Sequence, residues 1–174
     1  MATNDPIKVL HLFGPNFGSV FSGHEKRWIW QFSEWNDSTV SHYILNSKDY
    51  KVVKTSCVKA DRHVQQTDNS RFFWTAKSII SLLKNARSYD ILHIHNQNWD
   101  GLLSGPFLRL LNKKTIFEIS LMGSGTPTAL SQEYLGHLKL FCFKSMNKFL
   151  CISDALKDDC LKYDISKDKI EVIL

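Results

Sequence analysis

The sequence has no apolar run long enough to cross a membrane. A spanning helix needs about 18 or more consecutive apolar residues, and no such run occurs in the 174 residues. The N-terminus, MATNDPIKVLHLF, has no basic region ahead of its short apolar segment, so it does not resemble a secretory signal peptide. We therefore expect a cytoplasmic protein whose contact with a membrane, if any, is peripheral.

Cysteine is scarce, and no two cysteines form a C-x-x-C pair. The four are Cys57, Cys142, Cys151 and Cys160. Cys142 and Cys151 lie in the apolar segments LFCFK and FLCIS. This pattern favours reduced, buried thiols over disulfides, as is usual for a cytosolic protein.

Dense clusters of basic residues are also absent, although the net charge is +5. Scattered lysines and arginines give little support for nucleic-acid binding. The hydrophobic fraction of 43% and the charged fraction of 22% are ordinary for a globular protein. A chain of this length fits one domain and can bury a core without disulfides or a structural metal.

Short apolar runs alternate with segments of helical length. The predicted strands are Ile7–Phe13, Val40–Leu45, Lys51–Val58, Asp90–His95, Lys114–Leu121, Lys148–Ile152 and Ile170–Leu174. The predicted helices are Gly23–Trp35, Arg71–Ala86, Leu102–Leu111, Ser131–Asn147 and Ser153–Tyr163, with Lys59–Asn69 as a loop. Pro106 requires a position in the first helical turn or a kink, and Ser153 is a suitable N-cap. The order predicts an α/β fold with a doubly wound, mostly parallel, Rossmann-like sheet.

A glycine-rich loop, GPNFGSVFSGHEKR, follows the first predicted strand. It lacks the G-x-G-x-x-G fingerprint of dinucleotide-binding folds. Gly18 and Gly23 have P-loop spacing, but His24 and Glu25 replace the lysine and the hydroxyl residue, which argues against an NTPase. Anion binding by backbone N–H groups and an ordinary turn both remain open.

The segment DILHIHNQNWDG is the second candidate site. His93 and His95 share one face of a strand, and ligands of open parallel sheets bind at the carboxyl ends of strands. We therefore predict a core role for His93 and a functional role for His95. A zinc site needs a third ligand, and only a chance approach of Asp100 or Cys151 would supply one, so we expect no metal.

A third candidate is FEISLMGSGTP, in which Glu118 lies in an apolar strand and Gly123 begins a loop at its end. Ser120 lacks the G-x-S-x-G context of a nucleophile. Most aromatic residues have the helical spacing of core residues. Trp99 is the exception, because the pattern places it in the polar loop after His95.

Four segments, in this order, resemble the N-terminal domain of retaining glycosyltransferases of the GT-B architecture, the family-4 group. They are IKVLHLFGPNFGSVFSGHEKRWIWQF, DILHIHN, KTIFEISL and FLCISDALKDDCLKYDISKDKIEVIL. The last is the most specific, since a strand, a serine cap, a helix and a closing strand agree in spacing. Together the segments cover almost the whole chain.

The resemblance implies transfer of a sugar from a nucleotide-sugar to a glycan or lipid-linked acceptor, with no cofactor and no obligatory metal. His95 is the implied catalytic residue, positioning the transferred sugar by hydrogen bonding. The residues implied to bind substrate or donor phosphate are Gly18, Ser22, Gly23, His24, Glu25, Asn96, Trp99, Ser120, Gly123 and Ser153.

The sequence departs from the family pattern in three places. Ser22 replaces a usual glycine, Ser120 replaces a frequent histidine, and the chain ends at Leu174, before the family's N-G-v-D and E-x7-E motifs. We therefore expect residues 1–174 to form the acceptor-binding domain, inactive alone, with the nucleotide-sugar domain supplied in cis or by a partner chain. The alternatives are a non-catalytic scaffold subunit and part of a GT-B sugar-nucleotide epimerase.

Overall fold

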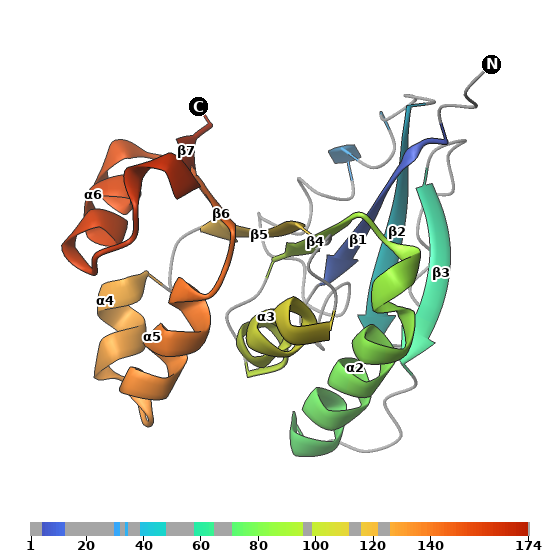
Figure 1. Cartoon of the computed structure of the whole chain (residues 1–174), viewed down its shortest axis with the longest axis horizontal. Coiled ribbons are helices and arrows are strands. Elements are labelled where there is room, and N and C mark those ends of the chain that lie inside the picture. The colour runs from blue at the N-terminus through green and yellow to red at the C-terminus, as the bar shows by residue number, and fades with distance from the viewer. Residues whose placement is uncertain are drawn as a thin grey trace.

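A computed structural model describes residues 5–12, 30–31, 34, 39–47, 58–64, 71–95, 99–111, 116–121 and 126–173. Within these residues, parallel strands form one seven-stranded sheet in the order β3-β2-β1-β4-β5-β6-β7 (Figure 1). The strands are β1 (Ile7–Leu12), β2 (Val40–Ser47), β3 (Val58–Val64), β4 (Ile91–Ile94), β5 (Ile116–Leu121), β6 (Lys148–Cys151) and β7 (Ile170–Val172). The predicted doubly wound parallel sheet is thus confirmed.

After β3 in the chain, each strand is connected to the next by one or more helices. They are α2 (Arg71–Asn85), α3 (Trp99–Leu111), α4 (Pro127–Gln132), α5 (Gly136–Lys144) and α6 (Asp154–Lys162), with 3-10 turns at Ala86–Ser88 and Lys167–Lys169. Of the predicted helix Gly23–Trp35, the described residues Trp30, Gln31 and Glu34 are helical. In Figure 1, α2, α3 and α5 lie on the same side of the sheet.

The hydrophobic core lies between these helices and one face of the sheet. Its largest fully buried side chains are Phe143, Phe149, Leu12, Leu92, Ile94, Leu102 and Leu108. Leu12 and Ile94 come from the neighbouring strands β1 and β4, whereas Leu102 and Leu108 come from α3. Because side chains alternate along a strand, Val9 and His11 of β1 and Ile91 and His93 of β4 face the opposite side of the sheet.

The loop predicted at Lys59–Asn69 was wrong over Lys59–Val64, because β3 occupies Val58–Val64. The strand predicted at Lys51–Val58 shares Val58 with β3, and residues 51–57 lie outside the described residues. Among the described strands, β3 lies at the edge of the sheet and pairs with β2 alone, with a register irregularity between Tyr43 and Leu45. An edge strand tolerates polar and charged residues, so the sequence VKADRHV gave no apolar signal.

The single helix predicted for Ser131–Asn147 is instead two helices, α4 and α5. The break includes Leu135, whose φ of 58° lies in the left-handed region that is costly for a branched side chain. Gly136 follows, and a Cβ there would lie 2.4 Å from the carbonyl oxygen of Ser131. The close approach of the two helical ends therefore requires glycine at this position.

The helix predicted for Leu102–Leu111 begins three residues earlier, at Trp99. Pro106 therefore lies inside α3 and not in its first turn. Proline has no N–H to donate to the carbonyl one turn earlier. Nearby, the Ser104 hydroxyl donates to the carbonyl of Gly101 at 2.7 Å.

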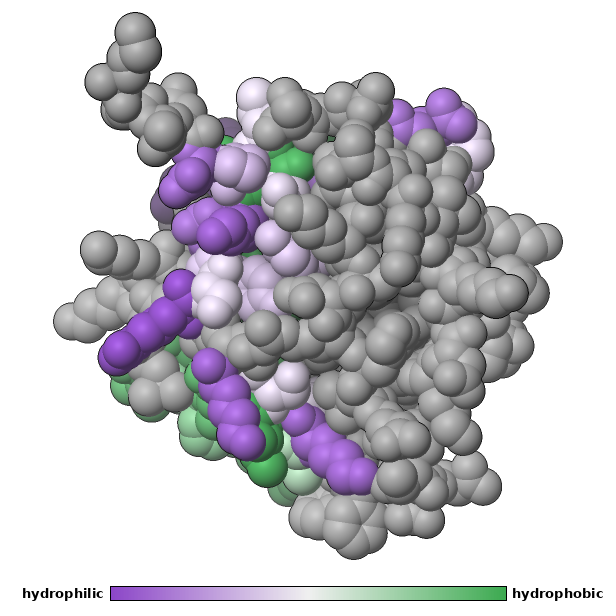
Figure 2. Space-filling view, turned by 90° about the vertical axis from the view of Figure 1, so that its right-hand side faces the viewer, coloured by the Kyte–Doolittle hydropathy of each residue, from purple (hydrophilic) through white to green (hydrophobic). Residues whose placement is uncertain are grey.

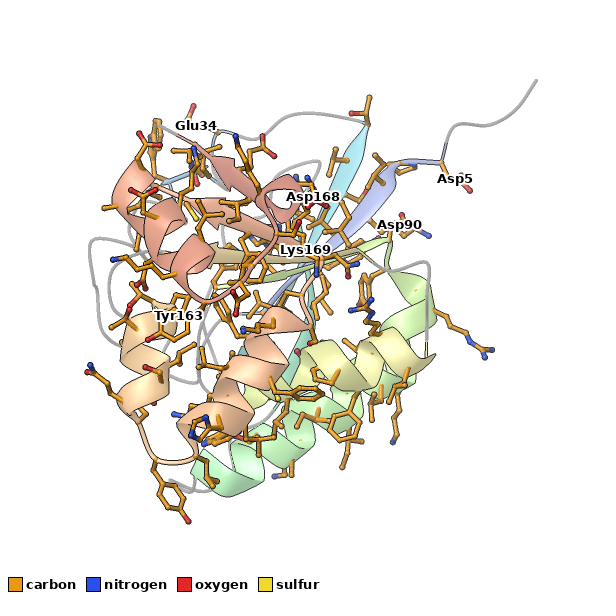
Figure 3. All side chains as sticks on the ribbon, turned by 60° about the vertical axis from the view of Figure 1, so that its left-hand side comes forward. Asp5, Glu34, Asp90, Tyr163, Asp168 and Lys169 are labelled. Carbon is orange, nitrogen blue, oxygen red and sulfur yellow. The ribbon has the colours of Figure 1, made fainter. Side chains whose placement is uncertain are left out.

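The predicted cap of the last helix is confirmed, because the Ser153 side chain accepts a hydrogen bond from the N–H of Leu156. The same helix is tied to α4 through Asp159, whose carboxylate accepts from both the N–H and the hydroxyl of Thr128. A second link joins Ser131 of α4 to the hydroxyl of Tyr163 at 2.9 Å (Figure 3). The helix layer is therefore held by polar contacts as well as by apolar packing.

β2, which follows β1 in the chain, lies on one side of β1 in the sheet, and β4 lies on the other side of β1. The strand order thus changes direction between β1 and β4, which makes this pair the topological switch point. At its amino end, Asp90 accepts a hydrogen bond from the N–H of Lys8 at 2.8 Å (Figure 3). At its carboxyl end, the N–H of His95 donates to the carbonyl of Leu12 at 2.9 Å.

Figure 2 views the molecule from the side at which β3 lies in Figure 1. Its described surface is mainly hydrophilic, with apolar side chains gathered at the lower edge, where the helices lie. No helix among the described residues is long and apolar enough to span a bilayer.

Candidate functional site

Four histidines lie on the face of the sheet opposite α2 and α3. His11 of β1 and His93 of β4 are directly paired in register, and His42 of β2 is paired with Val9, two residues before His11. His95 follows β4, two residues after His93, and so continues the same face. These four side chains, His11, His42, His93 and His95, are called the histidine cluster below.

Hydrogen bonds and ring contacts join the cluster. Nδ1 of His11 lies 2.9 Å from Nε2 of His95, and Nε2 of His11 lies 2.9 Å from Nδ1 of His42. The ring centroids of His93 and His95 are 4.0 Å apart, and the rings of His11 and His95 are stacked at 5.2 Å. His11 therefore occupies the centre of the cluster, between rings from two neighbouring strands.

Burial determines the charge of the central ring. His11 is 1% exposed, His93 7% and His95 8%. Desolvation, followed by the nearby rings of His93 and His42, holds the pKa of His11 well below its ordinary value. His11 is consequently neutral at physiological pH, with one ring nitrogen as donor and the other as acceptor.

The cluster lies where this fold class binds ligands. His11 is the penultimate residue of β1 and His95 comes directly after β4, so both are at the carboxyl end of the switch point. A neutral imidazole in that place can donate or accept a hydrogen bond, transfer a proton or bind a metal ion. The arrangement can therefore position a polar substrate group or hold a cation.

The structure changes the interpretation of the H-x-H segment. His93 and His95 share a face of the sheet, and His93 is buried as predicted. His95 is buried as well, although it was expected beside a polar loop. From the sequence, a third metal ligand was expected only by a chance approach of Asp100 or Cys151. The structure supplies His11, and one ring nitrogen from each of His11, His93 and His95 lies within 4.8 Å of the others.

Several predicted site residues lie outside the described residues. They are Gly18, Ser22, Gly23, His24, Glu25, Asn96 and Gly123. For Ser120 the structure gives its place in β5, opposite Leu150 of β6. Substrate binding by these residues stays a prediction.

Two other predicted residues are placed in detail. Trp99 was expected in a polar loop but is the first residue of α3, with the Lys139 ammonium of α5 lying 5.2 Å from the centre of its ring. Lys139 also forms an ion pair with Glu133. Ser153 caps α6 through its side chain. The contacts of both residues therefore join helices or helical turns, and their substrate roles stay predictions.

Sequence reasoning missed His11 and His42. Each lies within an apolar run, IKVLHLF or VSHYIL, that predicts a strand and gives its histidine no separate signal. The signal that could have found them is their position. His11, His42 and His93 lie on the same face of neighbouring strands, because β1 is placed between β2 and β4. Recognising it required the strand order and register, which one strand alone does not reveal.

The cysteines behave as predicted where the structure describes them. Cys142, Cys151 and Cys160 are free and buried. Burial raises the pKa of Cys142, and the hydrogen bond with Cys151, together with burial, raises the pKa of Cys160. Both thiols are protonated at neutral pH and are therefore poor nucleophiles.

Neither protein-family models nor the sequences of characterised proteins match the chain. Solved structures do. The UDP-GlcNAc 2-epimerase from Neisseria meningitidis bound to UDP-GlcNAc is similar over 95% of this chain, with 16% identity and a TM-score of 0.65. Anabaena HepE in complex with UDP and glucose is similar over 96%, with 13% identity and a TM-score of 0.62.

A third similar structure is the lipopolysaccharide outer core galactosyltransferase WaaB in its apo form, with 17% identity over 95% of this chain and a TM-score of 0.58. The chain spans less than half of each structure: 46% of the epimerase, 44% of HepE and 45% of WaaB. At these identities the likeness establishes the fold, which is that of a GT-B-type, Rossmann-like domain.

Proposed function

We propose that the chain is the acceptor-side domain of a family-4-like glycosyltransferase that transfers a hexose from a nucleotide-sugar with retention of configuration. The acceptor is a glycan or a lipid-linked glycan. The observation that carries the proposal is the buried histidine cluster at the carboxyl end of the β1–β4 switch point, in a domain of GT-B type. Supporting it, solved neighbours of this fold hold UDP-GlcNAc or UDP and glucose.

In this proposal His95 positions the transferred sugar by hydrogen bonding, and His11 fixes the orientation of His95. The 2.9 Å contact between their rings supports the second role, because it restrains rotation of the His95 ring. His95 needs no general-base role in such a transfer. The proposed reaction requires no cofactor and no obligatory metal.

The remaining roles belong to groups around this centre. Backbone N–H groups of the glycine-rich loop, from Gly18 to Glu25, approach the diphosphate of the donor. A second Rossmann-like domain, in cis or on a partner chain, binds the nucleotide and stabilises the charge of the leaving diphosphate. The net charge of +5 is compatible with anionic donors and acceptors.

A sugar-nucleotide 2-epimerase is the second candidate. The observation that favours it is the TM-score of 0.65 to the Neisseria enzyme, against 0.62 and 0.58 for HepE and WaaB. Both reactions use a nucleotide-sugar, and both fit a fold that hosts many functions. They differ in one chemical requirement, because an epimerase acts without an acceptor.

The deciding experiment incubates the protein with radiolabelled UDP-glucose, UDP-galactose and UDP-GlcNAc, with and without a membrane glycolipid extract as acceptor. The 174-residue chain is assayed alone and joined to whatever second domain its gene encodes. Acceptor-dependent release of UDP, with label in the glycolipid, is the expected result and requires the second domain. Acceptor-independent formation of the C2 epimer would assign the epimerase, and a failure to bind or turn over any UDP-sugar would indicate a scaffold subunit.

Two variants of the active protein test the assignment of His95. We expect His95→Ala to lower kcat/KM by at least about 100-fold, comparable with the loss of one preorganised hydrogen-bonding group. His93→Ala is the matched control, since it removes a buried ring of the same face. Equal losses of activity accompanied by equal losses of stability would make His95 a structural residue.

A further inference from the structure

The histidine cluster has a second chemical property, which does not depend on the sugar reaction. One ring nitrogen from each of His11, His93 and His95 falls within a group spanning at most 4.8 Å. Nδ1 of His11 and Nε2 of His95 are 2.9 Å apart. In a tetrahedral zinc site with Zn–N bonds of about 2.0–2.1 Å, ligand nitrogens lie about 3.3 Å apart. The 2.9 Å pair is slightly shorter than this separation, and the upper limit of 4.8 Å for the group is longer than it.

We propose that His11, His93 and His95 bind a divalent transition-metal ion, zinc by preference, on the buried face of the β1–β4 pair. All three ligands are imidazoles, which suit zinc, cobalt, nickel and copper. Magnesium and calcium prefer oxygen ligands and are not expected here. Three histidines leave a fourth position open for water or a substrate oxygen.

The ligands are carried by paired strands and not by long loops. His11 and His93 are opposite each other in the β1–β4 register, and the backbone N–H of His95 is fixed to the carbonyl of Leu12. Sites built on regular elements hold their geometry more accurately than sites on loops. The backbone positions of all three proposed ligands are therefore restrained by hydrogen bonds between β1 and β4.

His42 supplies the orienting contact that metal-bound histidines usually have. A ligand histidine commonly uses its second ring nitrogen in a hydrogen bond, which fixes its tautomer and ring orientation. Nε2 of His11 makes such a contact with Nδ1 of His42 at 2.9 Å. This leaves Nδ1 of His11, the nitrogen that faces His95, as the metal ligand.

Protons can be accommodated within the cluster. The 2.9 Å contact between His11 and His95 contains one shared proton, which must leave when both nitrogens bind the metal. That proton moves to the far nitrogen of the ring that donated it, and the His11–His42 bond can reverse its direction accordingly. Both rings remain neutral imidazoles, which is the form that binds metal.

The test uses metal-free protein, dialysed against EDTA, and titrates it with cobalt(II) chloride and zinc chloride. We expect one equivalent of cobalt to produce the intense visible absorption of a four-coordinate site, and one equivalent of zinc to displace it. X-ray absorption of the zinc-loaded wild-type protein should count three imidazole nitrogens. Magnesium chloride, at the same concentration, should have no effect.

Variants distinguish this site from surface histidines. His11→Gln and His95→Gln should each remove the cobalt spectrum, whereas His42→Gln should weaken zinc binding by about 10- to 100-fold. His137→Gln, on the exposed surface of α5, is the control and should bind as the wild type does. Circular dichroism confirms that each variant is folded.

Two results would overturn the proposal. One is wild-type protein that binds no cobalt or zinc at millimolar concentrations. The other is binding with fewer than three imidazoles, or binding that survives in folded His11→Gln or His95→Gln protein. Neither result bears on the proposed sugar transfer, which is assayed separately by acceptor-dependent UDP release.

Discussion

The two faces of the central strands are built from alternate residues of the same segments, yet they bury opposite chemistry. Leu12 adjoins His11 in β1, and Ile94 lies between His93 and His95, and all five side chains are buried. Parallel strands covered on both faces usually read as continuous apolar runs. The leucine and isoleucine face stabilises the fold, whereas the histidine face contributes mutual hydrogen bonds and carries the proposed ligand site. Polar residues at every second position of a strand that is buried on both faces therefore suggest a functional site on that face.

The largest expected effect is on the apolar face. Leu12→Ala should lower the free energy of unfolding by about 2–5 kcal/mol, because a fully buried leucine leaves a cavity when it is truncated. Urea denaturation measures the change as a lower midpoint with an unchanged slope. Leu110, which is 80% exposed on α3, is the control, and Leu110→Ala should change stability by less than about 0.5 kcal/mol. A similar loss of unfolding free energy in Leu12→Ala and Leu110→Ala would show that the buried apolar face does not contribute more to stability than an exposed leucine does.

The second effect is the stabilisation of the folded chain by zinc, which should depend on the histidine face and not on the apolar face. Zinc at 100 times its dissociation constant should raise the free energy of unfolding of the wild type by about 2.7 kcal/mol, because it binds only the folded chain. Leu12→Ala should keep this increment and His11→Gln should lose it, as measured by urea denaturation with zinc or EDTA. An increment that persists in His11→Gln would place the metal elsewhere.

The third effect concerns the helices that cover the apolar face. Asp159→Ala should cost about 1–3 kcal/mol, because Thr128 loses the acceptor for its N–H and its hydroxyl. Asp158→Ala, the neighbouring residue on the exposed side of α6, should cost less than about 0.5 kcal/mol. Equal costs would show that the contact between α4 and α6 adds nothing to stability.

Asp159 also makes stability depend on pH. Its partial burial raises the pKa, but the hydrogen bonds from Thr128 and Thr126, with Lys162 nearby, outweigh this and hold the pKa below its ordinary value. A carboxyl group with a lower pKa in the folded chain stabilises fully above its unfolded pKa and loses that contribution as pH falls below about 4. Asp159→Asn should therefore flatten the fall in stability below pH 4, measured by thermal unfolding, and an unchanged profile would contradict this assignment.

The smallest expected effect is on the histidine face without metal. His42→Gln should cost about 1 kcal/mol or less, the net value of one hydrogen bond, because glutamine retains a polar group near His11. Chemical denaturation in EDTA is the measurement. A loss as large as that of Leu12→Ala would mean that the two faces contribute equally to folding, and the contrast between them would fail.

Much of the fold was predictable because apolar runs and caps are local signals. The strands at Ile7–Leu12 and Ile91–Ile94, and the helix capped by Ser153, follow from short stretches of sequence. β3 was not predicted at Val58–Val64 because an edge strand needs little apolar surface. The break at Leu135 was missed because leucine has no local preference for the left-handed backbone that it adopts there.

The candidate site was predictable only in part, for a related reason. The H-x-H spacing indicated His95, since period-two alternation and the end of the strand are visible in the sequence. The contribution of His11 depends on β1 lying beside β4, and the two hydrogen-bonded rings, His11 and His95, are 84 positions apart in the sequence. A pairing over that distance is a property of the topology, which composition and periodicity do not specify.

The central position of β1 has a consequence for the order of events during synthesis. β1 leaves the ribosome first, but its partner β4 ends more than 80 residues later. At translation rates of about 5–20 residues per second, the nascent chain carries an incomplete sheet for roughly 4–17 seconds. Through that interval the apolar strand β1 lacks one of the two neighbours that it has in the finished sheet.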